Sequence, residues 1–540
     1  MSRFTTAGYG VFLALAFVLL QSQDLTGGSN LVFYSIAALA LIIFFFIIMS
    51  VADNFMVIES KQLGVDSEEN LGLFPRMRDI FRRKKPEYLE EAHVYDLNVG
   101  YDIPIKGEPE PTVEEATGVT RYAISPPDFI GLQPIPKVVV EEGDSVKAGD
   151  VLFYDKKMDR VKFCAPVSGE VIAVERGLKR SIARIVILAD KEQQSRDYGE
   201  LPDLNGPREE IVNFLLESGA WPGIRQRPYN VVADPDVVPR DIFVSTFDTA
   251  PLAPDMTLAI RGREAEFQTG VNVLRRLTDG FVYLGLDGRG DAPSPYEFVD
   301  GAEKRYFRGK HPAGNVGTHI HLIHPAGAGD NTVWTLGVNE VLLLGEIFKN
   351  GRFNTERLVA IGGHPIAKPQ HVRTYAGANV GELTKDQRIP QNNRVISGDV
   401  LSGQQVDAEG GFLGFFDNQI STIPEGNEAE VFGWLLPIKP RASINPTIPV
   451  FSNELEITTN SHGERRAFVV NNDYEQVFPL DIYLQQLMKA ILVNDFEQME
   501  GLGLYELVEE DVALSEFVCV SKQPLQQILR EGLDTMREQG

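Results

Sequence analysis

Residues 31–51, LVFYSIAALALIIFFFIIMSV, form the segment that most constrains how this chain folds. They are 21 residues without a charge or a proline, and about 20 apolar residues are enough to cross a bilayer as a helix. Residues 4–23 are also uncharged, and the connector at 22–30 contains Gly27 and Gly28. The sequence therefore predicts a transmembrane helical hairpin over residues 1–55, with a cleaved signal peptide as the alternative for its first half.

Basic residues flank this hairpin. Arg3 precedes it, and residues 76–85 contain six Lys or Arg in ten positions. Because Lys and Arg collect on the cytoplasmic side of membrane segments, we expect both ends of the hairpin and the soluble bulk of the chain in the cytoplasm. Residues 56–95 are interpreted as a basic cytoplasmic linker, which also suits contact with anionic membrane lipid.

Charge and cysteine content argue against two kinds of function. A formal net charge of −25 argues against nucleic-acid binding, which needs a basic surface. The chain has only two cysteines, Cys164 and Cys519, whereas a disulfide framework or an iron–sulfur cluster typically uses about four or more. We therefore expect no cluster in this chain.

Tight turns separate short apolar runs in the next part of the chain. Gly-Asp pairs at 143–144 and 149–150 lie between the apolar residues 138–140 and 151–154. Short strands joined by such turns predict a small β barrel, which we assign to residues 96–190. The pattern resembles the biotinyl/lipoyl-like hammerhead fold.

In most hammerhead domains, a lysine at a hairpin tip carries a prosthetic group. Two lysines of this chain lie near that position. These are Lys156 and Lys157, followed by Met158. The usual biotin signature, a lysine between two methionines, is missing. A structural barrel with exposed lysines is therefore favoured over a modified one.

Helical and extended patterns alternate over residues 191–355. Apolar spacing predicts helices at 208–218, 264–277 and 338–349, and strands at 241–247, 281–286 and 318–324. This alternation predicts a Rossmann-like, three-layer α/β domain with a mainly parallel sheet. The glycine-rich residues 285–290 are the best candidate for a phosphate or flavin loop. Pro293 and Pro295 interrupt any helix after them, so an ordinary surface turn is favoured.

Histidines gather in the second half of this domain. Five of the eight in the chain are His311, His319, His321, His324 and His364. On a strand over 318–324, the first two of its three histidines would share a face. Such a pair could begin a metal site, but spacing identifies no third ligand, so hydrogen bonding in a cleft or at a subunit face is favoured.

The remaining chain divides into a β-rich and a helical part. Short strands near 358–362 and 369–373, and a helix opening at 377–383, predict an SLBB-like β-grasp module over 356–435. Residues 436–540 are predicted to be helical, with helices starting at Pro479 and Pro524. The acidic triplet Glu509-Glu510-Asp511 is interpreted as a solvated turn between them.

Several ordered segments resemble the A subunits of the bacterial sodium-translocating NADH:quinone reductases. The most specific is GKHPAG at 309–314 followed by GTHIH at 317–321. Other matching segments are YDIPIKG at 101–107, LESGAW at 216–221, RVISGDVLSG at 394–403 and IPEG at 423–426.

The resemblance implies a membrane-anchored A subunit of a sodium-pumping NADH:quinone oxidoreductase, on the cytoplasmic side of the bacterial inner membrane. Such a protein supports quinone reduction and complex assembly, and by itself is not expected to be catalytic. FMN, FAD, riboflavin and iron–sulfur centres belong to partner subunits, of which the membrane B subunit is the expected neighbour. NADH and quinone are substrates of the complex. The fold over 191–355 is expected to be similar to the flavin-carrying subunit of respiratory complex I, without its cluster-binding cysteines.

Within this resemblance, the candidates for a quinone or partner face are Lys310, His311, His319, His321 and His364. No catalytic, cofactor-binding or metal-binding residue is assigned.

The chain departs from the family in two places. Family members usually begin near Leu97 and have no membrane segment, so residues 1–95 are additional. Ser515 stands where many members have a cysteine, four residues before the match to Cys519, which excludes a thiol role for that pair.

Two other functions stay open. A non-catalytic membrane adaptor would also join an anchor to a lipoyl-like barrel, although adaptors usually carry a coiled-coil hairpin inside the barrel. A flavin-binding NADH dehydrogenase subunit would depend on the glycine-rich residues 285–290.

Overall fold

The computed structural model describes residues 85–539, except 133–134, 386, 388–391, 427–432, 434–440 and 446–453, together with the helical residues 38–41, 43–45, 47–48, 51–52 and 55. The chain divides into two units, Met1–Lys85 and Pro86–Gly540. In the described part of the first unit, Leu41, Phe44 and Phe55 are exposed. Within the described residues, no helix combines the length and the apolar character needed to cross a membrane. Most of the predicted hairpin, and the basic residues 76–84, lie outside the described residues.

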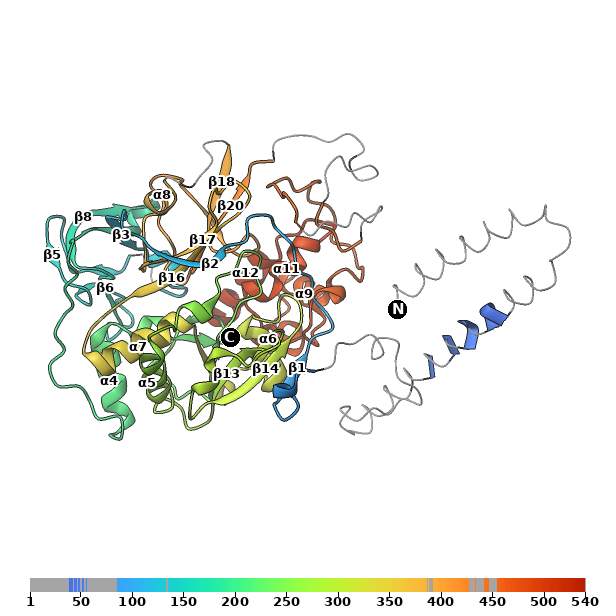
Figure 1. The fold of residues 1–540 in the computed structure, drawn as a ribbon, viewed down its shortest axis with the longest axis horizontal. Helices are drawn as coiled ribbons and strands as arrows, with labels where there is room; N and C mark the ends of the chain where they lie inside the picture. Colours follow the sequence, from blue (N-terminus) through green and yellow to red (C-terminus); the bar gives the residue numbers. More distant parts are fainter. Residues whose placement is uncertain are drawn as a thin grey trace. The chain divides into compact units, whose positions relative to one another are not determined.

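The largest sheet of the second unit has seven strands, in the order β1-β14-β13-β12-β15-β10-β11. Figure 1 labels β13, β14 and β1 of this sheet in the lower part of this unit. The first five strands of the sheet are parallel, while β10 is antiparallel to both of its neighbours. The sheet is therefore mainly parallel, as predicted. The strands are β1 (Val94–Asp96), β14 (Glu303–Arg308), β13 (Val282–Asp287), β12 (Asp241–Ser245), β15 (Val333–Leu336), β10 (Arg225–Arg227) and β11 (Val231–Val232).

Helices cover both faces of this sheet. Ile242 and Val244 of β12 belong to the main core, which includes side chains of α5 and α7, whereas Phe243 packs with α6. Alternate residues of a strand point to opposite faces, so this part has three layers. The helices are α4 (Arg208–Ser218), α5 (Glu264–Leu274), α6 (Val316–Ile323) and α7 (Val338–Asn350).

The strand predicted at 318–324 is wrong, because these residues form helix α6. Val316, Ile320 and Ile323 are spaced four and three residues apart, and they place one helical face against Phe243. Residues two apart on a helix point in nearly opposite directions, so His319 and His321 do not share a face. The apparent alternation arose because two of the histidines, at 319 and 321, stand on either side of an apolar residue.

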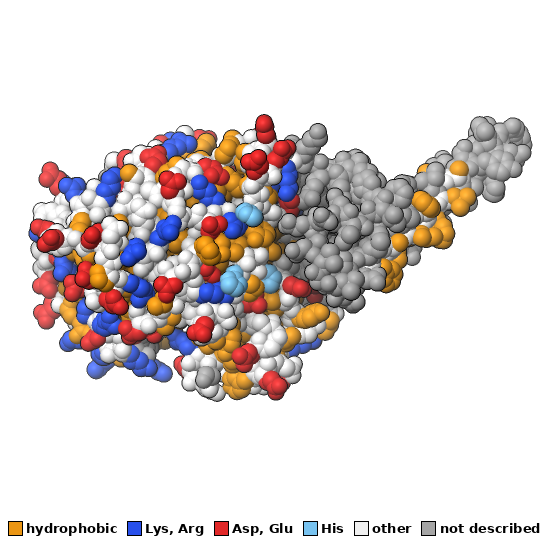
Figure 2. Space-filling model, turned by 90° about the horizontal axis from the view of Figure 1, so that it is seen from below, with side chains coloured by type: hydrophobic (Ala, Val, Ile, Leu, Met, Phe, Trp, Pro, Cys, Tyr) orange, Lys and Arg blue, Asp and Glu red, His pale blue; other side chains and the backbone are white. Residues whose placement is uncertain are grey.

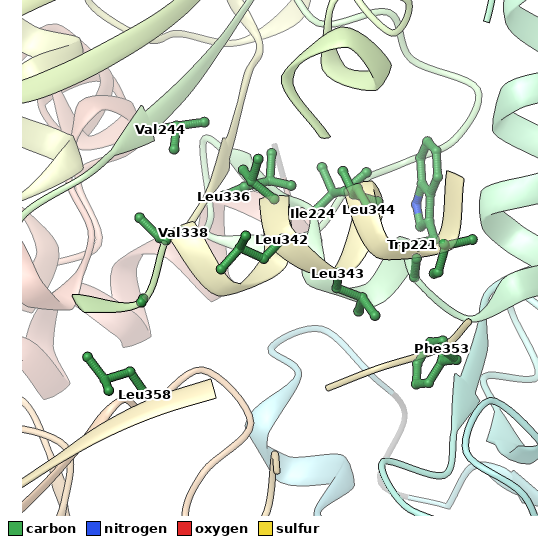
Figure 3. Packing of buried hydrophobic residues seen from close by; sticks show 14 of the residues in the cluster. Trp221, Ile224, Val244, Leu336, Val338, Leu342, Leu343, Leu344, Phe353 and Leu358 are labelled. Atoms are coloured by element: carbon green, nitrogen blue, oxygen red, sulfur yellow. The ribbon is translucent and has the colours of Figure 1, made fainter. Parts of the chain in front are cut away.

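The main core includes side chains of this sheet and of helices α4, α5 and α7, and it continues into the barrel. Figure 3 shows Leu342 and Leu344 of α7 beside Leu336 and Ile224, with Trp221 next to them. Trp221 donates its indole N–H to the carbonyl oxygen of Ala233 at 2.7 Å. A buried Trp thus keeps its polar group satisfied.

The barrel consists of two small sheets, β3-β9-β8-β5 and β4-β6-β7. Lys156 and Lys157 are exposed in the loop between β6 and β7, near the predicted hairpin tip. The strands are β3 (Arg121–Ile124), β4 (Lys137–Val138), β5 (Ser145–Val146), β6 (Val151–Tyr154), β7 (Lys162–Cys164), β8 (Gly169–Arg176) and β9 (Ile182–Ala189).

A six-stranded sheet follows the α/β part, with the order β19-β18-β20-β16-β17-β2. Its edge strand β2 precedes the barrel in sequence and pairs in parallel with β17. The chain therefore contributes one strand to this sheet before it forms the strands of the barrel. The elements are β2 (Glu110–Glu115), β16 (Glu356–Gly362), β17 (Gln370–Tyr375), α8 (Val380–Thr384), β18 (Asn393–Ser397), β19 (Gln404–Val406) and β20 (Gln419–Pro424).

The C-terminal part is helical and has its own core, which includes Leu487, Leu529 and Leu533. The helix predicted from Pro479 begins later, at Leu484. Before it, the Asp481 N–H donates to a histidine ring of α6. The helices are α9 (Leu484–Leu492), α10 (Phe496–Gly501), α11 (Glu509–Val518) and α12 (Leu525–Gln539).

The solvated acidic turn predicted at 509–511 is also wrong. These residues form the first turn of α11, and Asp511 is completely buried. No local pattern indicates this burial, because the compensating cation, Arg227, lies 284 residues away in β10.

Close packing of α5 against α7 leads to a testable prediction. A Cβ atom on Gly345 would lie 1.7 Å from the backbone oxygen of Glu266. Gly345→Ala should therefore force the helices apart and lower the free energy of unfolding by about 2 kcal/mol, despite the better helix propensity of Ala. Urea unfolding followed by tryptophan fluorescence measures this. Gly501→Ala is the control, since nothing lies within 4 Å of its added Cβ; equal losses in both variants would contradict the packing argument.

Candidate functional site

The loops that follow β12, β13 and β14 meet at one edge of the seven-stranded sheet. These three strands are parallel neighbours, so their carboxyl ends lie together. This is the edge at which open α/β sheets usually bind ligands. The edge brings together residues 246–249, 288–291 and 309–315.

A column of stacked rings lies at this edge. The ring of His319 lies 3.8 Å from that of Phe307 and 5.7 Å from that of Phe247, centroid to centroid. Phe307 also stacks on Tyr95 at 5.2 Å, since the two residues are paired on adjacent strands. Such stacked rings form a rigid wall beneath the loops.

His319 is neutral in this column. Its Nε2 lies 2.8 Å from the carbonyl oxygen of Ala313, and only 2% of the residue is exposed. Burial lowers the pKa of His319 to about 4. With Nε2 donating to the carbonyl, Nδ1 faces Gly285, where an added Cβ would lie 2.4 Å away. Gly285 therefore makes room for the histidine ring.

The glycine-rich residues 285–290 do not lead into a helix. Gly285 lies within β13, and the chain continues through a turn to the short 3₁₀ helix Pro295–Phe298. Arg289 pairs with Asp287 at 2.7 Å and lies over the ring of Phe247 at 5.6 Å. Because a phosphate-binding glycine loop uses a helix N-terminus, this geometry favours the surface turn.

His311 is buried behind the edge. Its Nδ1 lies 3.2 Å from Thr249 Oγ1, and its backbone N–H donates to Asp102 Oδ1 at 2.9 Å. Burial lowers the pKa of His311, although the neighbouring carboxylates of Asp248 and Asp399 oppose this. The adjacent Lys310 is exposed.

The other two candidate histidines lie elsewhere. The His321 Nδ1 lies 2.8 Å from Glu506 Oε2, and its Nε2 accepts the Asp481 N–H at 3.0 Å. This ring therefore fastens α6 to the C-terminal helices. His364 follows β16, with Nε2 3.6 Å from Glu456 Oε1 and 30% of its side chain exposed. Figure 2 shows histidine side chains reaching one face of the molecule beside hydrophobic and basic side chains.

Two functional features were missed from the sequence. The first is the ion-paired cluster of Arg227 with Glu510 and Asp511, both at 2.8 Å. The second is the aromatic column, because spacing alone does not reveal rings from different strands. Among the described residues, no three His, Cys, Asp or Glu side chains are grouped to hold a metal ion.

Domain models define the class of protein. The N-terminal barrel-sandwich hybrid domain of NqrA matches residues 96–190, the second alpha/beta domain of NqrA matches 207–353, and the NQRA C-terminal domain matches 358–408. The predicted hammerhead-type barrel and SLBB-like module are thus confirmed. The chain is built as a subunit of a redox complex.

Curated relatives give the particular family. The A subunit of the Na(+)-translocating NADH-quinone reductase of Neisseria meningitidis (serogroup A) is 39% identical over 449 residues, which covers 82% of this chain and 99% of that protein. Its namesake from Saccharophagus degradans is 38% identical over 450 residues, with the same coverage. The chain belongs to the NqrA family, the A subunits of the Na(+)-translocating NADH-quinone reductases, as its motifs predicted.

Similarity to solved structures is much weaker. An NAD+-reducing [NiFe]-hydrogenase in the H2-reduced state has a TM-score of 0.29 and 11% identity, covering 43% of this chain and 52% of that one. At this level the similarity carries no conclusion.

The buried His319 leads to a prediction about pH. Its pKa is lowered from 6.5 to about 4 in the folded state, so its contribution to stability is complete above pH 6.5 and is lost as the pH falls towards 4. His319→Gln keeps an N–H donor but does not titrate. Its deficit in unfolding free energy relative to wild type should therefore shrink by roughly 3 kcal/mol between pH 7 and pH 4.

Denaturant unfolding of both proteins at pH 7, 5.5 and 4 measures this difference. The difference is used because other groups, such as Asp511, titrate in the same range. His324→Gln, which removes a histidine whose side chain is 54% exposed, is the control. A deficit that does not change with pH would contradict a neutral, buried His319.

Proposed function

We propose that this chain works as the A subunit on the cytoplasmic side of a sodium-pumping NADH:quinone oxidoreductase, where it supports quinone reduction and assembly of the complex. The observation that carries this proposal is the 39% identity over 82% of the chain to a protein of that name. The expected partners are the other subunits of the complex, especially the membrane B subunit. Substrates of the complex are NADH and quinone.

The quinone or partner face is proposed to lie along residues 101–107, which run from the sheet edge to the six-stranded sheet. At one end the Tyr101 N–H donates to the His311 carbonyl oxygen at 2.9 Å. At the other, Lys106 pairs with Glu456 at 2.8 Å, and the same carboxylate lies near His364. Residues 101–107 thus connect candidates that are more than 50 positions apart in sequence.

The candidate side chains differ in solvent exposure, and we propose different roles for them accordingly. Lys310 is exposed, with Nζ 5.9 Å from the ring centroid of Tyr101. A cation beside an aromatic ring suits a quinone, whose planar ring can stack and whose carbonyl oxygens accept hydrogen bonds. His311 and His319 are buried, so they are proposed to support this face without touching its ligand. His321 is proposed to hold the C-terminal helices in place.

The chain is proposed to hold no flavin and no iron–sulfur centre of its own. Its two cysteines are both buried, and burial raises the pKa of Cys164 to about 12. A cluster ligand must be a thiolate. The turn at 285–290 lacks a following helix, which speaks against the alternative of a flavin-carrying NADH dehydrogenase.

We propose that residues 31–51 anchor the chain in the membrane and that the basic residues 76–85 flank this anchor. Because these apolar residues carry no charge, the hairpin is proposed to be an anchor and not an ion path, which would need polar groups inside the bilayer. An adaptor function is less favoured, since family membership covers most of the chain.

A mild-detergent pull-down of the full-length protein tests the function. Mass spectrometry and a sodium-stimulated NADH:quinone assay are applied to the eluate, and flavin- and iron-containing partners are expected to co-purify with activity. Lys310→Gln should reduce either the recovered complex or the apparent affinity for quinone roughly tenfold. Lys349→Gln, which breaks an ion pair on α7, is the control and should leave both unchanged.

Recovery of the complex and the KM for quinone together distinguish a quinone-binding face from a partner-binding face. A raised KM for quinone with normal recovery assigns Lys310 to the quinone, and poor recovery assigns it to a partner protein. A chain that elutes alone, without flavin or activity, would overturn the proposed function.

A further inference from the structure

A small cavity of about 50 Å³ lies where the barrel, the seven-stranded sheet and the six-stranded sheet meet. Asp128 and Phe129 contribute from the barrel, Arg225 and Asn230 from β10 and its turn, and Phe416 from the loop before β20. None of these residues belongs to the edge formed by the ends of β12, β13 and β14. The cavity is therefore a separate feature with both charged and apolar walls.

Arg225 supplies a positive charge to the cavity. Its guanidinium lies over the ring of Phe416, with Cζ 4.8 Å from the centroid. Within the described part of the chain, its side chain makes no hydrogen bond or ion pair at contact distance. A guanidinium stays charged at any physiological pH and carries five N–H donors, so this wall can bind an acceptor. Arg225 is partly exposed, and its charge partly offsets the raised pKa of the buried Asp417.

Asn230 supplies a second unsatisfied polar group. Its Oδ1 is buried and, among the described residues, has no hydrogen-bond partner. The residue is fixed in the left-handed region, with φ 56°, at the turn between β10 and β11. Buried amide oxygens are normally hydrogen-bonded, so a ligand with an O–H group would complete this site.

Asp128 also lines the cavity. Its Oδ2 accepts the Phe415 N–H at 2.9 Å. Burial raises the pKa of Asp128 to about 7, with Asp417 adding to the rise and Arg184 opposing it. Near neutral pH this carboxyl is protonated about half of the time, which reduces its repulsion of an anion and gives it an O–H to donate.

The size of the cavity limits the ligand. A water molecule needs roughly 10–15 Å³ of such space, so about 50 Å³ holds three or four heavy atoms. An oxyanion of that size that keeps one hydroxyl, such as hydrogen carbonate, can place two oxygens against a guanidinium and its hydroxyl against the Asn230 oxygen. We propose that this cavity binds a small planar oxyanion with one hydroxyl, of the hydrogen carbonate class, and that the anion stabilises the contact between the barrel and the two sheets.

Binding is tested on the full-length chain in detergent at pH 7.0. Sodium hydrogen carbonate, acetate and phosphate are compared with sodium chloride at equal ionic strength, by thermal unfolding and by titration calorimetry. Hydrogen carbonate should bind with a stoichiometry of one, raise Tm saturably by roughly 2 °C, and bind more tightly than acetate, which lacks the hydroxyl, or phosphate, which has five heavy atoms. No saturable effect from hydrogen carbonate would overturn the proposal and leave a water-filled cavity.

Matched variants locate the site. Arg225→Gln should abolish binding, and Arg225→Lys should keep part of it. Arg352→Gln, the same change at an exposed arginine, should bind as wild type. Binding that survives Arg225→Gln unchanged would place the anion elsewhere and overturn the proposal.

A second substitution covers the case in which Arg225→Gln fails to fold. Asn230→Asp keeps the shape of the side chain and its tolerance of positive φ, but adds a negative charge beside the ligand. It should weaken binding at least tenfold while Tm in sodium chloride stays close to wild type. Unchanged affinity in Asn230→Asp would likewise overturn the proposal.

Discussion

The arrangement of this protein depends on one buried ion-paired group. Arg227 is 1% exposed and donates to Glu510 and Asp511, both at 2.8 Å. Asp511 also accepts the Val508 N–H at 2.9 Å, so the same carboxylate caps α11. A buried charge left without its partner costs about 3–5 kcal/mol, and removal of either side would therefore weaken the contact between the C-terminal helices and the sheet.

This ion-paired group also positions the sheet edge. The side chain of Asn315, which precedes α6, donates to the Glu510 carbonyl oxygen at 3.2 Å. Gly317 lies so close to Asp511 that an added Cβ would be 2.0 Å from the carboxylate. Since α6 carries His319, contacts made by α11 fix the aromatic column. The motif at 309–321 is thus explained by its packing against the aromatic column on one side and against α11 on the other.

Polar side chains around the site and the cavity differ in burial and in whether they have partners. His319 and His321 have partners that fix their rings, and both are structural. Lys310 at the edge and Arg225 in the cavity are instead cations that lie beside aromatic rings. Among the described residues neither cation has an ion-pair partner, so each can accept a ligand at little cost. We propose one for a quinone or partner and one for a small anion.

The sequence by itself determined the family, the barrel and SLBB-like modules, and most helices and strands, because motifs and local periodicity are carried by neighbouring residues. It misjudged 318–324, where alternating histidines resembled a strand, and 509–511, where acidic residues resembled a solvated turn. Only the tertiary structure showed that Arg227 neutralises Asp511 and that Gly285 makes room for His319. Such pairs join residues from distant parts of the chain, and burial, which decides whether a charge or a ring is structural or available, exists only once those parts have packed together.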